Sequence, residues 1–240
     1  MMKQKISIVT IILTSLIASS YYYQAVPDNS LTDSEKKAGW KLLFDGRSMN
    51  GWRAYKNQET NSWTAAKGIL YCKGSETDKS DKRADLITED QFENFELSVD
   101  WKISAKGNSG ILYMVTEQFP RSYQSGPEYQ LIDDVNFPEK LEEWQKTGAN
   151  YAMDPAPAAK PKPVGQWNTT RIVVNKGQVE HWLNGKKILE FEMWTDEWQK
   201  KKVNGKWKDA PGYGMSKKGH IALQDHGSEA WFKNVKIKEL

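Results

Sequence analysis

Residues 95–103 read Phe-Glu-Leu-Ser-Val-Asp-Trp-Lys-Ile, and apolar and polar side chains alternate along the whole stretch. Neighbouring side chains of an extended strand point to opposite faces of a sheet, so this period of two predicts a strand with one buried face. Further short strand-like runs, each bounded by turn residues, are found along the chain. They are 41–44, 63–66, 69–72, 86–88, 110–115, 128–132, 169–175, 178–183, 186–191, 220–224 and 230–239.

This many short strands predicts an all-β domain, a two-sheet antiparallel sandwich. The dipeptide Asn184-Gly185 lies between two of the predicted strands and is typical of a tight hairpin, because both central positions of that turn have positive φ. From the alternation, we expect four apolar side chains in different strands to face the core. They are Trp101, Ile111, Val173 and Ile221.

Two stretches interrupt the strand pattern. Residues 137–164 contain a short helix, expected around 140–146, and then the proline-rich segment 155–163, which cannot join a central strand. We expect this segment to form a wall or lid beside the sheet. The second stretch, 194–215, carries a lysine-rich run whose charges we interpret as a solvated face.

The N-terminus has the layout of a secretory signal peptide. Lys3 and Lys5 precede the apolar run 6–17, which small residues follow up to residue 20. We therefore predict a signal peptide at 1–20 and a secreted or periplasmic protein without a stable membrane span, the alternative being an uncleaved anchor. No cysteine follows the apolar run, so a lipoprotein anchor is unsupported.

The mature chain divides into an exposed lead-in, 21–38, with a helical turn expected at 32–37, and one domain, 39–240. Loss of the two N-terminal lysines lowers the formal net charge from +3 to +1, which gives no electrostatic reason to expect nucleic-acid binding. Cys72 is the only cysteine, so the domain has no internal disulfide. Its 11 tryptophans suit sugar-stacking surfaces and equally suit a sandwich core. Oligomeric state stays open.

Residues 219–227, Gly-His-Ile-Ala-Leu-Gln-Asp-His-Gly, are the first candidate for chemistry. If the strand continues to its end, Ala222, Gln224 and His226 share a face. Histidine is the side chain that ordinarily titrates near neutral pH, which makes His226 a candidate base. A polar strand end with a purely structural role is the alternative.

Several short motifs, in order along residues 39–240, resemble the 3-keto-disaccharide hydrolase domain family, formerly a domain of unknown function. They are Leu43-Phe44-Asp45-Gly46, Asn50-Gly51-Trp52, Gly107-Asn108-Ser109-Gly110-Ile111, Glu128-Tyr129-Gln130-Leu131-Ile132-Asp133, Gly165-Gln166-Trp167-Asn168, His181-Trp182-Leu183-Asn184-Gly185, Gln224-Asp225-His226-Gly227 and Trp231-Phe232-Lys233-Asn234. The resemblance implies a jelly roll of the concanavalin A-like lectin and glucanase type with a concave sugar-binding face. Gln166 departs from the family, in which many members carry Glu, so an essential acid–base role there is not expected.

Glu128, Gln130 and Asp133 have the spacing of the catalytic strand of laminarinase-type glucanases, but the middle carboxylate is an amide and the last is shortened. The change removes a charge and widens the gap, which disfavours retaining glycosidase chemistry. A regular strand would place Glu128 and Gln130 on one face, and Asp133 would join them only through a bulge. A standard endoglucanase is therefore the third hypothesis.

The family resemblance implies a substrate oxidised at carbon 3, and the ketone acidifies the hydrogen on carbon 2. We predict a carbohydrate-active enzyme in which His226 removes that proton and Glu128 serves as acid or second base, with β-elimination and water addition giving net hydrolysis. Six other side chains, together with Asp133, are predicted to bind substrate. They are Gln130, Asn108, Gln224, Trp167, Asn168 and Tyr151. The alternative is a noncatalytic lectin-like module, and no cofactor is expected for either.

The remaining candidates receive structural interpretations. His181 is expected on the sheet surface, and His220 lies too far from His226 along an extended strand, roughly 20 Å, for a metal pair. A metal site of His226, Glu128 and Asp133 is chemically allowed, but no close ligand pair marks it, so no metal is predicted. Asp225 should point away from His226. It and Asp45 are turn formers or ligands of a structural cation.

Overall fold

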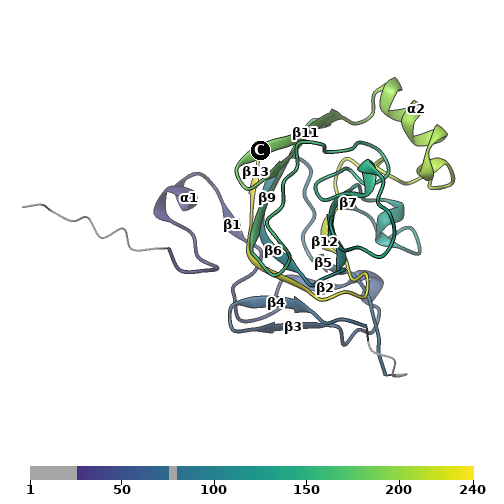
Figure 1. Ribbon diagram of the computed structural model, residues 1–240. Coiled ribbons are helices and arrows are strands. Elements are labelled where there is room, and N and C mark those ends of the chain that lie inside the picture. The colour runs from purple at the N-terminus through teal and green to yellow at the C-terminus, as the bar shows by residue number, and fades with distance from the viewer. Residues whose placement is uncertain (1–25, 76–79) are drawn as a thin grey trace, which may run out of the picture.

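The computed structural model describes residues 26–75 and 80–240, so the predicted signal peptide lies outside the described residues. Two antiparallel sheets pack face to face (Figure 1). The larger runs in the order β11 (Lys186–Glu192), β10 (Gln178–Leu183), β9 (Asn168–Asn175), β6 (Phe95–Ile103), β13 (Ala230–Glu239), β4 (Ile69–Cys72) and β3 (Trp63–Ala66), with β1 (Lys41–Leu42) paired to β13. The smaller runs β2 (Trp52–Ala54), β5 (Leu86–Thr88), β12 (His220–Leu223), β7 (Asn108–Val115) and β8 (Glu128–Ile132).

The predicted all-β sandwich is confirmed, and every predicted strand is present with boundaries that differ by no more than two residues. The largest differences are at β1, which ends at Leu42, and at β7, which begins at Asn108. The sequence missed β2, a three-residue strand that pairs with β5. A strand of that length is too short for alternation to be recognised.

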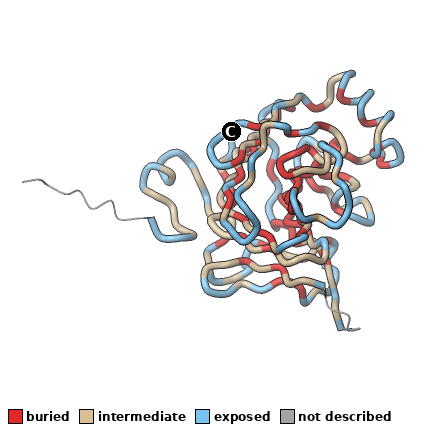
Figure 2. Tube along the Cα trace, viewed as in Figure 1, coloured by how far each residue is buried: buried red, intermediate tan, exposed pale blue. Residues whose placement is uncertain are grey.

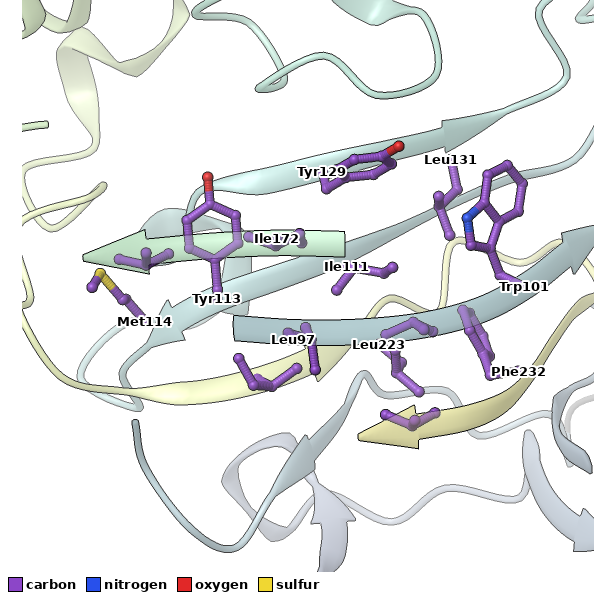
Figure 3. Packing of buried hydrophobic residues seen from close by; sticks show 14 of the residues in the cluster. Leu97, Trp101, Ile111, Tyr113, Met114, Tyr129, Leu131, Ile172, Leu223 and Phe232 are labelled. Atoms are coloured by element: carbon purple, nitrogen blue, oxygen red, sulfur yellow. The ribbon is translucent and has the colours of Figure 1, made fainter. Parts of the chain in front are cut away.

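The core lies between the sheets. Along β6, side chains alternate strictly between buried and half-buried, and the buried set, including Leu97 and Trp101, packs against residues of the smaller sheet such as Ile111 and Leu223 (Figure 3). Figure 2 shows the same pattern as buried stretches along the strands of both layers. Burial of these two apolar faces is the main force that holds the sheets together.

Trp101, Ile111 and Ile221 face the core as predicted, but the prediction for Val173 is wrong. In β9 the fully buried apolar residues are Ile172 and Val174, whereas Val173 is half-buried on the other face. Because successive side chains alternate, an error of one residue in the phase of the strand exchanges the two faces.

His181 was predicted on the sheet surface, and this is also wrong, because the side chain is completely buried. Its Nδ1 donates to the carbonyl of Gly148 at 2.9 Å, and the hydroxyl of Tyr113 donates to its Nε2 at 3.1 Å. Burial lowers the pKa of His181 to about 4, so the ring stays neutral. His181 belongs to β10 and Tyr113 to β7, so this contact joins the two sheets.

Short helices lie outside the sandwich. The predicted turn at the end of the lead-in is α1 (Asp33–Lys37), capped by Thr32 and Glu35. The helix expected at 140–146 is only the 3-10 turn η3 (Glu143–Gln145). The others are η1 (Tyr55–Asn57), η2 (Ser122–Gln124), α2 (Asp196–Asn204) and η4 (Lys206–Asp209). Within the described residues, no helix combines the length and the apolar character that a membrane crossing requires.

Neighbouring residues of β9 provide a test of the core. Ile172→Ala is expected to lower the free energy of unfolding by about 2–5 kcal/mol, because it leaves a cavity between the sheets. Val173→Ala, on the half-buried face, is expected to cost about 1 kcal/mol or less. Urea denaturation followed by circular dichroism measures both. Equal losses would contradict the assignment of the faces.

Candidate active site

A cavity of about 440 Å³ lies against the face of the smaller sheet that points away from the core. Its size is within the usual range of small-ligand sites. Tyr129 and Leu131 of β8 point into the core. Because side chains alternate along a strand, Glu128 and Gln130 point to the opposite face, into the cavity. Side chains from other segments complete the wall. They include Asp85, Asn108, Ser122, Tyr151, Lys206, Gln224, Asp225 and His226.

Gly110 makes room for the carboxyl of Glu128. The residue belongs to β7 and lies opposite Gln130 of β8. A Cβ atom at position 110 would lie 2.3 Å from Oε1 of Glu128 and 2.8 Å from its carboxyl carbon. The Glu128 side chain therefore occupies the space that a larger residue would fill, which explains the glycine in the middle of this strand.

Glu128 is the most strongly perturbed carboxyl of the cavity wall. Its side chain is almost completely buried, and burial, followed by the negative charge of Asp85, raises its pKa to about 8. The charge of Lys206 and a hydrogen bond from Gln224 act in the opposite direction. Near neutral pH the carboxyl is therefore mostly protonated and able to donate a proton.

His226 lies in the turn after β12, because the strand ends at Leu223. The imidazole is exposed to solvent and lines the same cavity as Glu128. Gln224 and Asp225 also line the cavity, so the alternation predicted for this stretch ends with the strand and Asp225 does not turn away from it.

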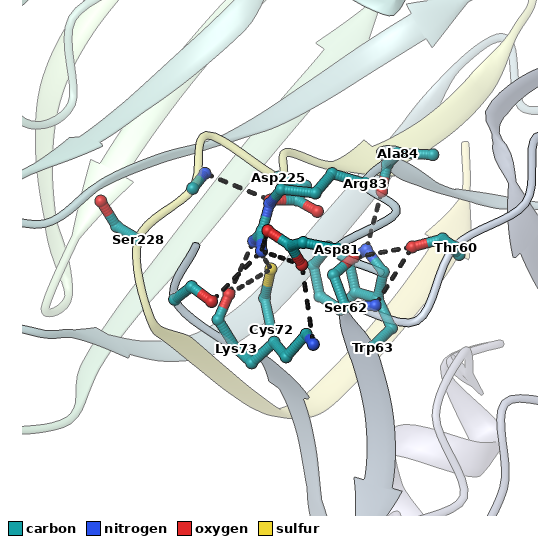
Figure 4. Close-up of polar contacts among 12 residues, drawn as sticks. Thr60, Ser62, Trp63, Cys72, Lys73, Asp81, Arg83, Ala84, Asp225 and Ser228 are labelled. Carbon is teal, nitrogen blue, oxygen red and sulfur yellow. Dashed lines mark hydrogen bonds and ion pairs between the residues drawn. The ribbon is translucent and has the colours of Figure 1, made fainter. Parts of the chain in front are cut away.

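The carboxylate of Asp225 forms an ion pair with Arg83, whose Nε and Nη2 donate to Oδ1 at 2.9 and 2.5 Å. Figure 4 shows Arg83 between Asp225 and Asp81, with the thiol of Cys72 beside it. Asp225 is thus held by a cation of the protein itself. Asp45 closes a turn, accepting from the backbone N–H groups of Arg47 and Ser48, both at 2.8 Å.

Two amides of the cavity wall carry unsatisfied oxygens. Asn108 Oδ1 and Gln224 Oε1 are two of the four buried side-chain N or O atoms without a hydrogen-bond partner among the described residues. Unpaired buried acceptors are costly and uncommon in folded proteins. Their occurrence together at one cavity fits a site for a ligand that offers donors, such as the hydroxyl groups of a sugar.

The structure brings six of the predicted site residues to this cavity and leaves three away from it. Those at the cavity are His226, Glu128, Gln130, Asn108, Gln224 and Tyr151. Asp133 and Asn168 instead line a second hollow of about 360 Å³ beside Pro161 and Pro163. Trp167 is the third residue away from the cavity. The centre of its ring lies 5.3 Å from the Nζ of Lys102 and 4.8 Å from the Nζ of Lys233.

Asp133 does not join Glu128 through a bulge. Its carboxylate closes the turn after β8, accepting from the backbone N–H groups of Lys106 at 2.8 Å and Asn136 at 3.0 Å, and these bonds hold its pKa below the ordinary value. Within the part of the chain that the structure describes, no cluster of three His, Cys, Asp or Glu residues has the arrangement of a metal site.

Sequence reasoning missed Asp85, Ser122, Lys206 and Trp207. Asp85 had a signal, because it is a charged residue immediately before the buried strand β5. Lys206 was interpreted as part of a solvated face and is exposed, but it also lines the cavity, where its Nζ donates to the hydroxyl of Tyr151 at 2.8 Å. Turns place these side chains, and a turn has no periodicity that could have marked them.

Residues 39–238 match the model of the 3-keto-alpha-glucoside-1,2-lyase-like domain, which covers most of the chain. The chain belongs to this family. A 3-keto-disaccharide hydrolase of Bacteroides thetaiotaomicron is 36% identical over 229 residues, and the match covers 84% of this chain and 79% of that protein.

Solved structures agree with the family assignment. A candidate glycosyl hydrolase from Parabacteroides distasonis is 42% identical, with a TM-score of 0.82 over 89% of this chain and 100% of its own. A second one from that organism is 29% identical, with a TM-score of 0.61 over 80% of this chain and 100% of its own. Together the comparisons support a carbohydrate-active enzyme.

The raised pKa of Glu128 predicts a pH-dependent stability. The folded protein binds this proton more tightly than the unfolded chain, so the stabilisation is complete below about pH 4.5 and is lost as the pH rises to about 8. Glu128→Gln removes the titration. The free energy of unfolding of the variant minus that of the parent is therefore expected to increase between about pH 4.5 and about pH 8. The expected increase is on the order of a few kcal/mol.

Urea denaturation at both pH values measures this difference, and Glu93→Gln, at an exposed position, is the matched control. The control should follow the parent at both pH values. If Glu128→Gln does the same, the carboxyl is not held protonated by the fold.

Proposed function

We propose that this protein is a carbohydrate-active hydrolase that cleaves 3-keto-glycosides by removing the proton on carbon 2 and eliminating the group on carbon 1. The observation that carries the proposal is that one cavity holds a buried carboxyl, Glu128, whose pKa burial raises to about 8, together with an exposed imidazole, His226. The family match and the name of the Bacteroides relative support the choice of substrate.

The ketone at carbon 3 makes the reaction accessible without a nucleophile. His226 takes the proton from carbon 2, and the electron pair of the broken C–H bond forms an enolate with the ketone. Collapse of the enolate forms the C1–C2 double bond and breaks the bond to the leaving oxygen, to which Glu128 supplies a proton. Water then adds across the double bond, with hydroxyl at carbon 1 and hydrogen at carbon 2, which completes a net hydrolysis.

The other groups of the wall fit the needs of this reaction. The amides of Asn108, Gln130 and Gln224 are suited to bind the sugar hydroxyls. Tyr151 accepts a hydrogen bond from the ammonium group of Lys206, which leaves its own hydroxyl hydrogen free to stabilise the enolate oxygen. A binding module would use rings and amides as well, but it would gain nothing from a carboxyl that burial keeps protonated.

The first experiment compares substrates. Purified protein is incubated with 3-keto-trehalose and 3-keto-glucosides, and in parallel with the unoxidised parent sugars, and the products are identified by mass spectrometry. Cleavage is expected only of the keto sugars, because only they have an acidic hydrogen on carbon 2. Cleavage of the parent sugars alone would refute the proposal.

Two variants test the roles of the acid and the base. His226→Gln is expected to lower turnover by roughly 100-fold or more while sugar binding persists, because the amide cannot remove the proton. Glu128→Gln should affect poor leaving groups most, since a good leaving group needs little protonation. Exchange of the carbon 2 hydrogen with deuterated solvent should vanish in the first variant and persist in the second.

Proton NMR of the substrate follows the exchange directly, and Glu93→Gln again serves as control because it lies outside the cavity. Exchange at the parental rate in His226→Gln would transfer the role of base to another residue, with Glu128 as the first candidate.

A further inference from the structure

Asp85 connects three separate segments of the cavity wall. The hydroxyl of Ser122, in η2, donates to its Oδ2. The backbone N–H of Asp225, one residue before His226, donates to its Oδ1 at 2.8 Å. The backbone N–H of Tyr55, at the start of η1, donates to its carbonyl oxygen at 2.8 Å. All three partners line the cavity, as does Asp85 itself, so this residue joins segments that are far apart in sequence.

We propose that Asp85 is a positioning residue of this site, which holds the His226 segment in the cavity wall and whose negative charge acts on the carboxyl of Glu128. This role deepens the proposed function and rests on it. The side chain of Asp85 uses both of its oxygens in contacts with the wall, so the residue acts through its neighbours.

Two carboxyls in one cavity, Glu128 buried and Asp85 half-buried, do not both ionise readily, so their surroundings decide which of them keeps the proton. Asp85 accepts two hydrogen bonds, from the hydroxyl of Ser122 and the backbone N–H of Asp225, and both favour its ionised form. Among the residues that the structure describes, the carboxyl of Glu128 accepts a hydrogen bond only from Gln224, and it lies next to Gly110. We therefore assign the negative charge to Asp85 and the proton to Glu128.

Other titratable and charged groups near the pair also affect the pKa values of Asp85 and Glu128. Burial and the charge of Asp225 raise the pKa of Asp85. Lys206 lowers the pKa of Glu128 from the rim of the cavity, and Tyr213, which is wholly buried, contributes only a neutral phenol near it. After burial, Asp85 is the largest cause that raises the pKa of Glu128, so removing its charge should have a measurable effect.

The test is a titration of Glu128 in the ligand-free protein. Protein labelled with ¹³C at the glutamate carboxyls is titrated by NMR, and the signal of Glu128 is assigned by its loss in Glu128→Gln. In Asp85→Asn, which keeps the shape of the side chain, the midpoint of Glu128 is expected to fall by about one pH unit. The high-pH limb of kcat/KM on a 3-keto-glycoside should move down by a similar amount.

Asp90→Asn is the matched control, because Asp90 is an exposed carboxyl that follows the same strand, β5. It should leave both the midpoint and the limb unchanged. If Asp85→Asn does not fold, Ser122→Ala removes one donor to Asp85 without a change of charge, and a smaller downward shift is expected. An unchanged midpoint in the folded variant overturns the proposal, even if activity is lost, because it would indicate a purely structural role.

The titration needs no substrate, so it separates this role from the proposed function. Absence of cleavage of every 3-keto-glycoside would refute the reaction while the shift of the Glu128 midpoint still established the coupling. The opposite result, cleavage with no shift in Asp85→Asn, would refute the role of Asp85 alone.

Discussion

Burial of both faces of β8 is the constraint on which the site depends. Tyr129 and Leu131 are buried against the larger sheet, as in any sandwich. Glu128 and Gln130 are buried on the opposite face, because segments from η2, the turn after β12 and η4 contribute to a wall over it. A polar strand face that would ordinarily be hydrated thus becomes the floor of a cavity, and the low polarity of that floor alters the chemistry of its carboxyl.

Two buried titratable groups show how the same physics gives different roles. His181 and Glu128 are both neutral near pH 7, because burial disfavours the charged form of each. Both ring nitrogens of His181 have partners, so it can serve as a link between the sheets and has nothing to offer a ligand. Glu128 lines a cavity next to amides with unpaired oxygens, and its proton is available for transfer.

The loops around the cavity are held by charge as much as by apolar contact. Arg83 binds the side chain of Asp225, and Asp85 binds its backbone, so the residue before His226 is fixed from two directions. These contacts join the start of β5 to the end of β12, two strands that pair in the smaller sheet. The position of His226 therefore depends on the register of a strand pair more than 130 residues apart in sequence.

The sequence by itself determined the sandwich, the family and the shared face of Glu128 and Gln130. Alternation is a local property, and it predicted nearly every strand because each one has an apolar face to bury. It could not determine the phase of β9 at Val173, since that strand carries apolar residues at consecutive positions. The motifs recognised in order along the chain identified the family without any knowledge of the contacts.

Only the tertiary structure decided which polar residues meet. It separated Asp133 from Glu128, buried His181, and brought Asp85 and Lys206 to the cavity from segments that no motif had marked. The physical reason is that turns and strand pairing set these positions, and both depend on contacts between residues distant in sequence. The protonation of Glu128 depends in the same way on what covers it and on the charge of Asp85, and neither is a property of residues 128–133.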